Sequence, residues 1–464
     1  MKVTLDVAAP LASPTLGRTQ RLLSGPILPT LLRLAVPSVV LVVVQALSSA
    51  IDGFYLGRLG PTVLAGVALV FPVWMLMVTT SAGALGGGIS SSVARALGAG
   101  RRDDANALVV HSLLLASAVG LAFSAVVLLG GPWLYRVLGG DGPALAPALA
   151  YSSVIFGGAL CVWWVNALAS LLRGSGEMLV PAGVIVGGEL VHLALAPLLI
   201  FGLGPFPPLG LVGGAASLIT SYALRALVLG AFVFGSRGEV GAPQHPLRPR
   251  LDLVWDVLRV ALPGSVNTIM TNVNVMVTTS LVAPSGVLAL AGYGLAARLE
   301  YLQIPLVFGI GTALVTLVGT NIGAGQVDRA RRIAWTGAGV AAAVTGAVGV
   351  LAAVAPDAWL GLFSADPAVL STGATYLRIV GPTYALFGLG LALYFAAQGA
   401  GRLLPALLAG LARLLIVVGG GWLVVIALHA DLVWLFGTIG LAFVVSGSLQ
   451  ALAINAAIVS KQAT

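Results

Sequence analysis

Three carboxylates lie within long apolar stretches of the sequence, at Asp52, Glu189 and Glu300. The other acidic residues fall at the ends of such stretches or between them. An ionised carboxylate in an apolar medium is costly unless it is protonated or paired, so each of the three is a functional candidate. The chemistry open to such a group is the binding and release of a proton or of another cation.

Asp52 comes near the end of the first apolar stretch and is the strongest candidate. Removal of its side chain from water favours the protonated form, which proton uptake and release at a buried site require. The alternative interpretation is a solvated helix end at the membrane surface, with Arg58 beside it. We expect Asp52 to couple ion movement to the function of the protein.

Glu189 and His192 are three residues apart and therefore share one face of a helix. A histidine titrates near neutral pH, so the two side chains form a second titratable pair that could assist Asp52. The imidazole could instead donate a hydrogen bond to a backbone carbonyl. The predicted ion-coupling residues are Asp52, Glu189 and His192.

The C-terminal half carries its own charges within apolar stretches, at Arg298, Glu300, Arg378 and Arg413. Arg298 and Glu300 are two residues apart and point to different helix faces, so they cannot pair with each other. Arg378 and Arg413 are therefore candidate partners. We expect a charge network that either locks this half as a buried ion pair or takes part in coupling or cargo binding.

Amides and aromatic rings also occur inside apolar stretches. Amides suit a wet cavity wall, and aromatic rings can stack on a flat or cationic ligand. Interhelical hydrogen bonds and aromatic belts at the membrane surface are the alternative interpretations. The cavity or substrate candidates are Tyr55, Trp74, Trp163, Asn166, Asn267, Asn272 and Asn274.

The elements that position these residues follow from composition. Hydrophobic residues make up 59% of the 464 residues and charged residues 8%, with a mean hydropathy of +1.05. This composition is typical of an all-α integral membrane protein. Apolar runs of about 20 residues predict twelve transmembrane helices, and a glycine run at 83–88 predicts a bending point in the second. The predicted helices are 28–51, 62–85, 107–130, 146–171, 180–201, 209–235, 256–282, 288–317, 333–355, 372–396, 405–428 and 432–458.

The second half of the sequence repeats patterns of the first half in the same order. The loop 97–105 returns at 322–330, and the turn 174–176 returns at 399–401 with the same offset. Pro37 returns as Pro263, one position beyond that offset. A duplication of this kind predicts two pseudo-symmetric lobes of six helices with a substrate site between them.

The predicted domains are an N-terminal tail (1–26), an N-lobe (27–235), a linker (236–254), a C-lobe (255–458) and a C-terminal tail (459–464). Most basic residues fall on the side of the two tails and the linker, which places that side in the cytoplasm of an inner (plasma) membrane protein. The net charge of +8 therefore reflects topology, and we expect no nucleic-acid partner.

Three of these patterns resemble one known family. Pro37 stands fifteen residues before Asp52, the loop Gly-Ala-Gly-x-x-Asp-x-Ala starts at both Gly98 and Gly323, and a Gly-x-Gly turn occurs in each half. Together they are similar to the multidrug and toxic compound extrusion (MATE) family, most of all its bacterial DinF-like branch. The resemblance implies two six-helix lobes arranged as a V and a central cavity. It also implies alternating access driven by protons or sodium ions, with amphiphilic, often cationic cargo.

The sequence departs from that family in the fifth predicted helix. The family often has an asparagine where His192 stands and an aspartate where Ala196 stands. Sodium prefers several oxygen ligands, so the missing second acid favours a proton as the coupling ion, although Glu300 and the polar seventh helix could still build a sodium site. We expect no other cofactor and no metal site.

An enzyme is not indicated, because the histidines are scattered without metal-ligand spacing and no nucleophile has a base beside it. A Walker-type loop is absent as well, which argues against ATP as the direct energy source. The function predicted is secondary active efflux of small amphiphilic molecules by a monomer in the lipid bilayer. The alternatives are a flippase for lipid-linked precursors of the same superfamily and a non-transporting membrane scaffold.

Overall fold

The computed structural model describes residues 17–140, 142–235, 238–242 and 249–459, in which every regular element is a helix. This confirms the predicted all-α class. The N-lobe consists of α2 (Ile27–Gly57), α3 (Pro61–Thr79), η1 (Thr80–Leu85), α4 (Gly86–Gly98), α5 (Arg102–Val137), η2 (Gly142–Ala144), α6 (Leu145–Gly157), α7 (Ala159–Gly174), α8 (Leu179–Phe201) and α9 (Gly210–Phe234).

The C-lobe repeats this order of long helices. Its elements are α10 (Leu251–Val282), η3 (Ala283–Ser285), α11 (Val287–Gly323), α12 (Val327–Val354), α13 (Pro356–Leu360), α14 (Pro367–Val380), η4 (Gly381–Thr383), α15 (Tyr384–Ala400), α16 (Leu404–Leu415), η5 (Ile416–Gly420), η6 (Leu423–Ala427) and α17 (Leu432–Val459).

Ten helical rods in the described ranges are long and apolar enough to cross a membrane, and the pair α6–α7, bent by 46°, makes an eleventh. Helix α10 has 32 residues and is more polar, with Asp252, Asp256 and Arg259 in its first turns. At about 1.5 Å per residue it is also long enough to cross, and with it the fold has the twelve rods predicted. The chain is thus a multi-pass membrane protein.

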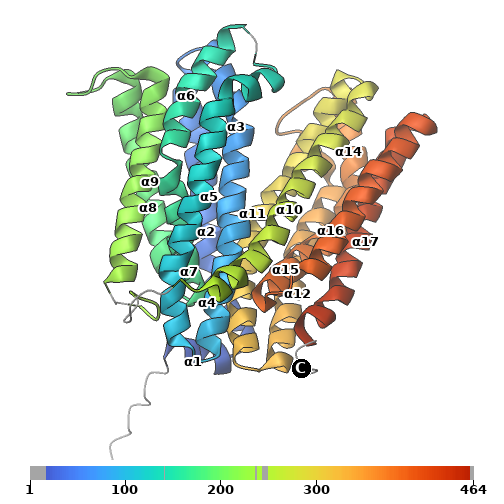
Figure 1. Cartoon of the computed structure of the whole chain (residues 1–464). Helices are drawn as coiled ribbons and strands as arrows, with labels where there is room; N and C mark the ends of the chain where they lie inside the picture. Colours follow the sequence, from blue (N-terminus) through green and yellow to red (C-terminus); the bar gives the residue numbers. More distant parts are fainter. Residues whose placement is uncertain (1–16, 141, 236–237, 243–248, 460–464) are drawn as a thin grey trace, which may run out of the picture.

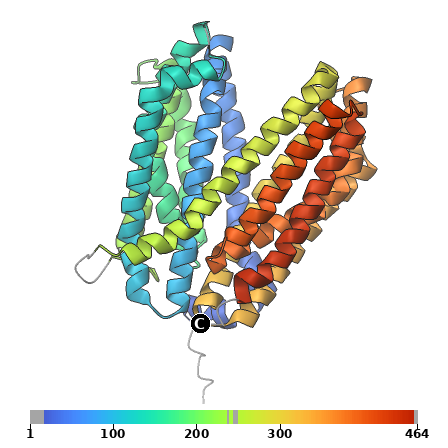
Figure 2. The same cartoon turned by 45° about the vertical axis from the view of Figure 1, so that its right-hand side comes forward.

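The two lobes form a V. In Figures 1 and 2 they meet at the lower end, where α4 packs against α11 and α15, and they diverge toward the upper end. We call the lower meeting point the apex. Helix α10 starts beside the N-lobe near the apex and runs diagonally to the upper end of the C-lobe (Figure 2). The two repeated loops, which follow α4 and α11, both lie at the apex end (Figure 1).

Matched glycines make the close crossing of α4 and α11 feasible. A Cβ atom on Gly98 would clash with the backbone carbonyl of Thr320, and one on Gly323 would clash with the carbonyl of Arg95. Gly98 and Gly323 occupy matching positions of the repeat, and so do Arg95 and Thr320. The repeat therefore supplies both halves of one symmetric contact, of the small-residue type that lets membrane helices approach closely.

At the predicted bending point of the second helix the helical geometry changes. A π-helical segment, η1, occupies Thr80–Leu85 at the start of the glycine run, and α4 continues beyond it to Gly98. π-helical turns widen a helix locally and are one of the identifiable causes of bends. The sequence placed the end of this helix near residue 85, because the polar and glycine-rich character of α4 hides its continuation.

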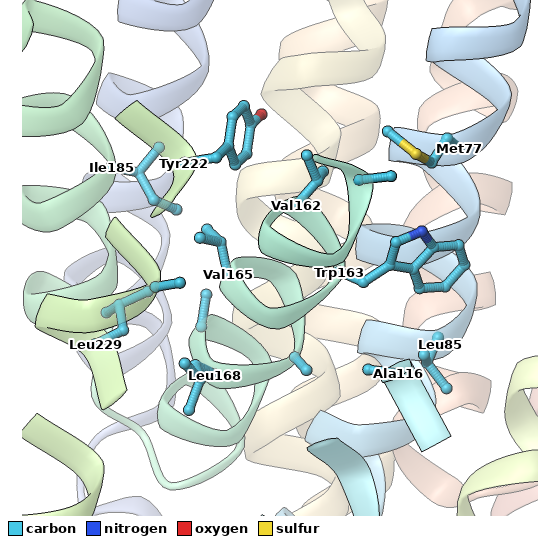
Figure 3. Packing of buried hydrophobic residues seen from close by; sticks show 14 of the residues in the cluster. Met77, Leu85, Ala116, Val162, Trp163, Val165, Leu168, Ile185, Tyr222 and Leu229 are labelled. Atoms are coloured by element: carbon cyan, nitrogen blue, oxygen red, sulfur yellow. The ribbon is translucent and has the colours of Figure 1, made fainter. Parts of the chain in front are cut away.

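Trp163 is a core residue of the N-lobe. Its side chain is 1% exposed and packs on Gly120, where a Cβ atom would lie 2.9 Å from the indole ring. Figure 3 shows it among apolar neighbours that include Met77, Leu85 and Ala116. The prediction of Trp163 as a cavity residue is therefore corrected for this conformation, since cargo has no access to it.

The predicted N-terminal tail contains a helix, α1 (Arg18–Ser24), that bridges both lobes. Arg18 pairs with Glu177 of the N-lobe. In the C-lobe, Asn321 donates to the carbonyl of Leu22 at 3.2 Å, and Arg329 donates to the carbonyl of Gly25. Residues 1–16 of that tail, residues 236–237 and 243–248 of the predicted linker, and residues 460–464 of the C-terminal tail lie outside the described residues.

Candidate functional site

The N-lobe brings Asp52 and His192 together between α2 and α8. The Oδ1 atom of Asp52 lies 3.4 Å from Nε2 of His192. On its other side, Nδ1 of His192 lies 3.0 Å from the hydroxyl of Ser217 on α9, which fixes the imidazole ring. The side chain of His192 is 3% exposed and that of Asp52 is 20% exposed, so the carboxylate is the more exposed member of the pair.

Asp52 is weakly held for a carboxylate in this position. Its Oδ1 atom is buried and has no hydrogen-bond partner among the described residues, because the geometry of the approach to His192 does not satisfy a hydrogen bond. Arg58, the partner in the alternative interpretation, lies over the ring of Phe54 at 4.6 Å and forms no ion pair with Asp52 in the part of the chain that is described. The approach of His192 at 3.4 Å is therefore the one close contact of a charged group with Asp52 in the described chain.

Glu189 is held firmly one helix turn away. It accepts a hydrogen bond from Ser48 of α2 at 2.8 Å and pairs with Arg225 of α9 at 3.1 Å. The guanidinium of Arg225 also donates to Ser221 at 2.7 Å and lies over the ring of Tyr222. Glu189 is thus an acceptor with two fixed donors, and its charge is compensated.

Arg225 changes two expectations. The positive-inside pattern would place Arg225 with the basic residues of the cytoplasmic side, whereas it is 1% exposed in the middle of α9. In addition, Glu189 and His192 do not form one titratable pair. Both face α2 and α9, but Glu189 pairs with Arg225, whereas His192 lies beside Asp52. Gly188 makes the room, because a Cβ atom there would lie 2.6 Å from the Cδ atom of Arg225.

Two predicted aromatic candidates line the same region. Trp74 of α3 meets Tyr222 edge to face at 6.0 Å, and Tyr55 of α2 meets Phe201 of α8 at 6.4 Å. Both side chains are half-buried, unlike Trp163. Tyr222 therefore connects Trp74 to the Glu189–Arg225 pair through one ring.

The C-lobe network is smaller than predicted. Glu300 lies 3.5 Å from Arg413 and accepts a hydrogen bond from the hydroxyl of Tyr376 at 3.0 Å. Arg298 and Arg378 are exposed, and neither has a carboxylate within 4 Å in the described chain. The reason is helix geometry, since Arg298 is two residues from Glu300 and Arg378 is two residues from Tyr376, which places both arginines on the opposite faces.

The four predicted amides do not converge. Asn166 on α7 donates to Ser81 of η1 at 2.7 Å, while Asn267 on α10 is half-buried. Asn272 is exposed and donates to the Thr268 carbonyl of its own helix, and Asn274 is buried with an unpaired Oδ1 atom. None of them contacts Asp52 or His192 through a hydrogen bond in the described residues.

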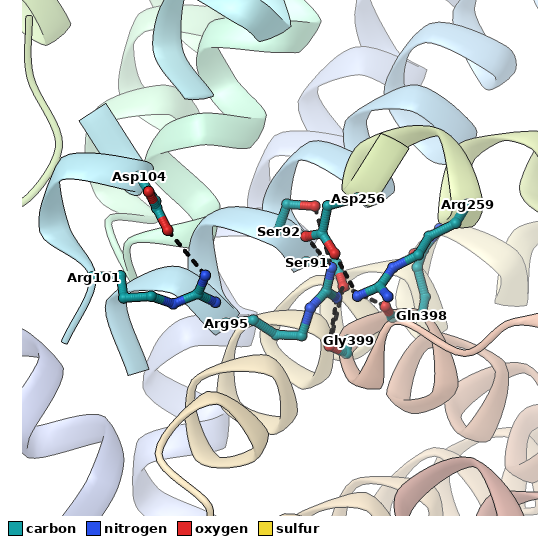
Figure 4. Close-up of polar contacts among 9 residues, drawn as sticks. All are labelled: Ser91, Ser92, Arg95, Arg101, Asp104, Asp256, Arg259, Gln398 and Gly399. Atoms are coloured by element: carbon teal, nitrogen blue, oxygen red, sulfur yellow. Dashed lines mark hydrogen bonds and ion pairs between the residues drawn. The ribbon is translucent and has the colours of Figure 1, made fainter. Parts of the chain in front are cut away.

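A further set of polar contacts, which the sequence analysis missed, joins the lobes at the apex (Figure 4). Arg95 of α4 pairs with Asp256 of α10 at 2.6 Å, and Arg259 also pairs with Asp256. Arg95 donates in addition to Ser91 and to the carbonyl of Gly399 on α15. The signal available in the sequence was a serine-rich segment, 90–92, just before Arg95 in a long apolar region.

Two hydrogen bonds cross the apex in a symmetric way. The hydroxyl of Ser91 on α4 donates to the carbonyl of Gln398 on α15, and the hydroxyl of Thr316 on α11 donates to the carbonyl of Arg173 on α7 at 2.7 Å. Each partner of the second bond is the repeat counterpart of a partner in the first. The Arg95–Asp256 ion pair has no such counterpart, because Thr320 stands at the matching position.

Comparison with known proteins identifies similar chains. A family model described as MatE matches twice, over residues 37–198 and 263–423, so that the two matches cover both lobes. The chain is 30% identical over 417 residues to a probable multidrug resistance protein NorM of Deinococcus radiodurans, covering 84% of each chain. It is 26% identical over 398 residues to an FAD transporter of Shewanella oneidensis, covering 86% of this chain and 88% of that protein.

Solved structures show the same arrangement. A transporter of the MOP superfamily from Pyrococcus furiosus, described as having a binding pocket of reverse polarity, superposes with a TM-score of 0.87 at 26% identity over 96% of this chain and 98% of that chain. A structure described as the outward-facing conformation of a multidrug resistance transporter superposes with a TM-score of 0.85 at 27% identity, covering 94% and 98% of the two chains.

Proposed function

The chain belongs to the MatE family, and from that premise we propose that it is a secondary active exporter that exchanges small organic molecules for protons across the inner membrane. The named relatives are transporters rather than enzymes, which supports movement of a compound as the activity. The basic loops at the apex support a cytoplasmic apex with both termini on that side. In this orientation the diverging upper ends of the lobes face outward.

The surroundings of Asp52 are the observation that supports a proton as the coupling ion. Its carboxylate reaches solvent, lies 3.4 Å from the imidazole of His192, and has an Oδ1 atom without a hydrogen-bond partner in the described chain. Protonation of Asp52 abolishes its attraction to a charged His192, so the contact between α2 and α8 depends on how many protons the pair holds. Proton binding from the outer side thereby biases the two helices toward one arrangement.

Sodium is the less favoured coupling ion in this lobe. Glu189 is already engaged by Arg225 and Ser48, so Asp52 is the one carboxylate near His192 that is left to bind a cation. A hard cation prefers a cage of several oxygen ligands, and an imidazole nitrogen is a poor substitute. A proton needs a single acceptor.

The cargo we propose is an amphiphilic cation. Half-buried Tyr55 and Trp74 flank the N-lobe site, and aromatic faces attract cations. A carboxylate that releases its proton when cargo arrives would attract a positive charge as well. The relatives differ in the cargo their names give, from multidrug to FAD, so cargo class is the part of the proposal that most needs its own test.

The experiment is gradient-driven transport in everted vesicles, with cationic dyes as probes and with proton and sodium gradients varied separately. Asp52→Asn is expected to abolish transport, because a neutral amide cannot carry the proton. Asp103→Asn, the same change at an exposed residue of the apex loop, is the matched control and should transport normally. Normal transport by the Asp52→Asn variant would remove Asp52 from the mechanism, and transport that follows the sodium gradient alone would replace the proton by sodium.

A further inference from the structure

A pocket lies at the apex, between η1, α4 and α7 of the N-lobe and α11 and α15 of the C-lobe. We call it the apex pocket; it is partly open, and its enclosed part has room for about one or two water-sized groups. Its lining follows the repeat, because residues of one lobe face their repeat counterparts in the other. The pairs that matter are Gly83 with Phe308, Gly87 with Thr312, and Arg173 with Gln398.

Arg173 brings an uncompensated charge into this pocket. The residue is 8% exposed, and its one side-chain hydrogen bond goes to the hydroxyl of Ser170 at 2.9 Å. No carboxylate of the described residues lies within ion-pair distance of it, and no residue lining the pocket is acidic. The other two buried arginines, Arg95 and Arg225, each have a carboxylate partner.

The opposite side of the pocket is neutral. Gln398 stands where the repeat would place a second arginine, and it is 1% exposed. Its side-chain amide donates to the carbonyl of Gly83 at 3.1 Å, which occupies the nearest backbone acceptor. The pocket therefore carries a single positive charge and no negative charge on its walls.

The C-terminal end of α7 does not account for the position of Arg173. A helix end presents carbonyl groups that attract a cation. Here those carbonyls already accept other donors: the amide of Gly176 and the hydroxyl of Thr316 bind the carbonyl of Arg173, and the amide of Glu177 binds that of Leu172. The remaining donors of this guanidinium are not enclosed by protein, so an acceptor from outside the chain can reach them in the pocket.

We propose that the apex pocket is an anion-binding site in which Arg173 holds one carboxylate or phosphate group. The planar guanidinium matches either group with two parallel hydrogen bonds. The pocket is partly open, so a small anionic group can reach the guanidinium, whereas a whole drug-sized ligand has no room in it. The group could belong to an organic cargo or to a free anion of the medium. The apex pocket is separate from the proposed coupling pair, because Asp52 and His192 are not among its lining residues.

The test is equilibrium binding of two probes, inorganic phosphate and acetate, to the purified full-length protein at constant ionic strength. Binding is read by isothermal titration and by the shift of the unfolding midpoint. Arg173→Gln copies the residue that the other lobe already has at this position, so it fits the pocket, and it should weaken binding at least tenfold. Arg173→Lys keeps the charge without the planar fork and should bind with intermediate affinity. Arg136→Gln, at an exposed position of α5, is the matched control and should bind like the unmodified protein.

The outcomes separate the two sources of the anion. Competition between phosphate and a fluorescent organic carboxylate would assign the site to an anionic group of cargo, and binding of phosphate without such competition would assign it to a free anion. Equal binding by the unmodified protein and by a monodisperse Arg173→Gln variant would overturn the proposal. So would a complete lack of binding of both probes to the unmodified protein. None of these readouts requires transport, so failure here is distinguishable from failure of proton coupling.

Discussion

Two carboxylates of the N-lobe have opposite surroundings although they face the same helices. Glu189 has an arginine and a hydroxyl as fixed partners, whereas Asp52 has one imidazole at 3.4 Å and an edge exposed to solvent. A group that changes its protonation state during a cycle must be able to lose its contacts cheaply. We therefore propose that Asp52 exchanges protons and that Glu189 positions α8 against α2 and α9.

The first residue-scale prediction concerns Glu189→Gln. This change leaves the guanidinium of Arg225 buried without a counter-charge, which should destabilise the protein by about 3–5 kcal/mol. The measurement is the unfolding midpoint of purified protein in detergent. Adding Arg225→Met to the same chain removes the orphaned charge and should restore much of the loss. An unchanged midpoint for Glu189→Gln alone would contradict the assignment.

The sequence predicts which carboxylates are buried but not what they contact. Asp52, Glu189 and Glu300 stand out because each interrupts an apolar stretch, and helix periodicity puts Glu189 and His192 on one face. Their partners come from other helices, so no spacing in the sequence links Arg225 or Tyr376 to these acids. Arg225 could have been recognised as buried, because it lies well inside the 25-residue helix α9 rather than at its end. Arg298 and Arg378 do not join the charge network. Each is two residues away from a network residue, Glu300 or Tyr376, and therefore points to another face of its helix.

At the scale of elements, the apex depends on helices that touch at backbone distance. Helices α4 and α11 cross where Gly98 and Gly323 each face a carbonyl of the other helix. At the other end of α4, η1 widens the second rod of the N-lobe directly before α4 begins. A rigid crossing next to a loosened segment suits a rod whose lower part stays in place while its upper part bends.

Gly98→Val should therefore force the apex apart. The added methyl groups would overlap the Thr320 carbonyl, and backbone has little freedom to give way. The readout is maleimide labelling of a reporter cysteine, Ala94→Cys, on the face of α4 that contacts Gly319, in a background with Cys161→Ala. Labelling should rise several-fold over the reporter alone. Gly339→Val serves as the control, because a Cβ atom there meets nothing within 4 Å, and labelling that is equal in both valine variants would refute the argument.

At the scale of the whole molecule, the two lobes are joined at one end by contacts of two kinds. The Ser91 and Thr316 hydrogen bonds obey the repeat, while the Arg95–Asp256 ion pair breaks it. A symmetric contact can be made and lost by both lobes in the same way. The ion pair instead ties the N-lobe to α10, the helix that leads into the C-lobe.

Asp256→Asn is expected to weaken apex closure, because Arg95 loses its one carboxylate partner in the described chain. The population with an open apex should increase, and the reporter at residue 94 should label several-fold faster than in the unmodified background. Arg259→Gln removes the other partner of Asp256 without cutting a contact between lobes, since both residues lie on α10, and should change labelling little. Equal effects of the two variants would show that the ion pair does not hold the lobes together.

The architecture was predictable from the repeat and from hydropathy, and the family match confirms both the resemblance and the duplication. The angle between the lobes was not predictable, because it depends on which end is closed. Helix α1 was also missed, since its seven residues are too short and too polar to register as a membrane helix. Assignment to the DinF-like branch remains a prediction.

Helix α1 also imposes an order on the biosynthesis of the protein. Its partners include Arg329, which is made 304 residues after the Gly25 carbonyl that it contacts. At about 5–20 residues per second, translation leaves α1 without its last partner for about 15–60 s. Helix α1 is thus made before both lobes and completes its docking only after residue 329 has been made, so its full docking marks the moment when both lobes have been inserted and have met.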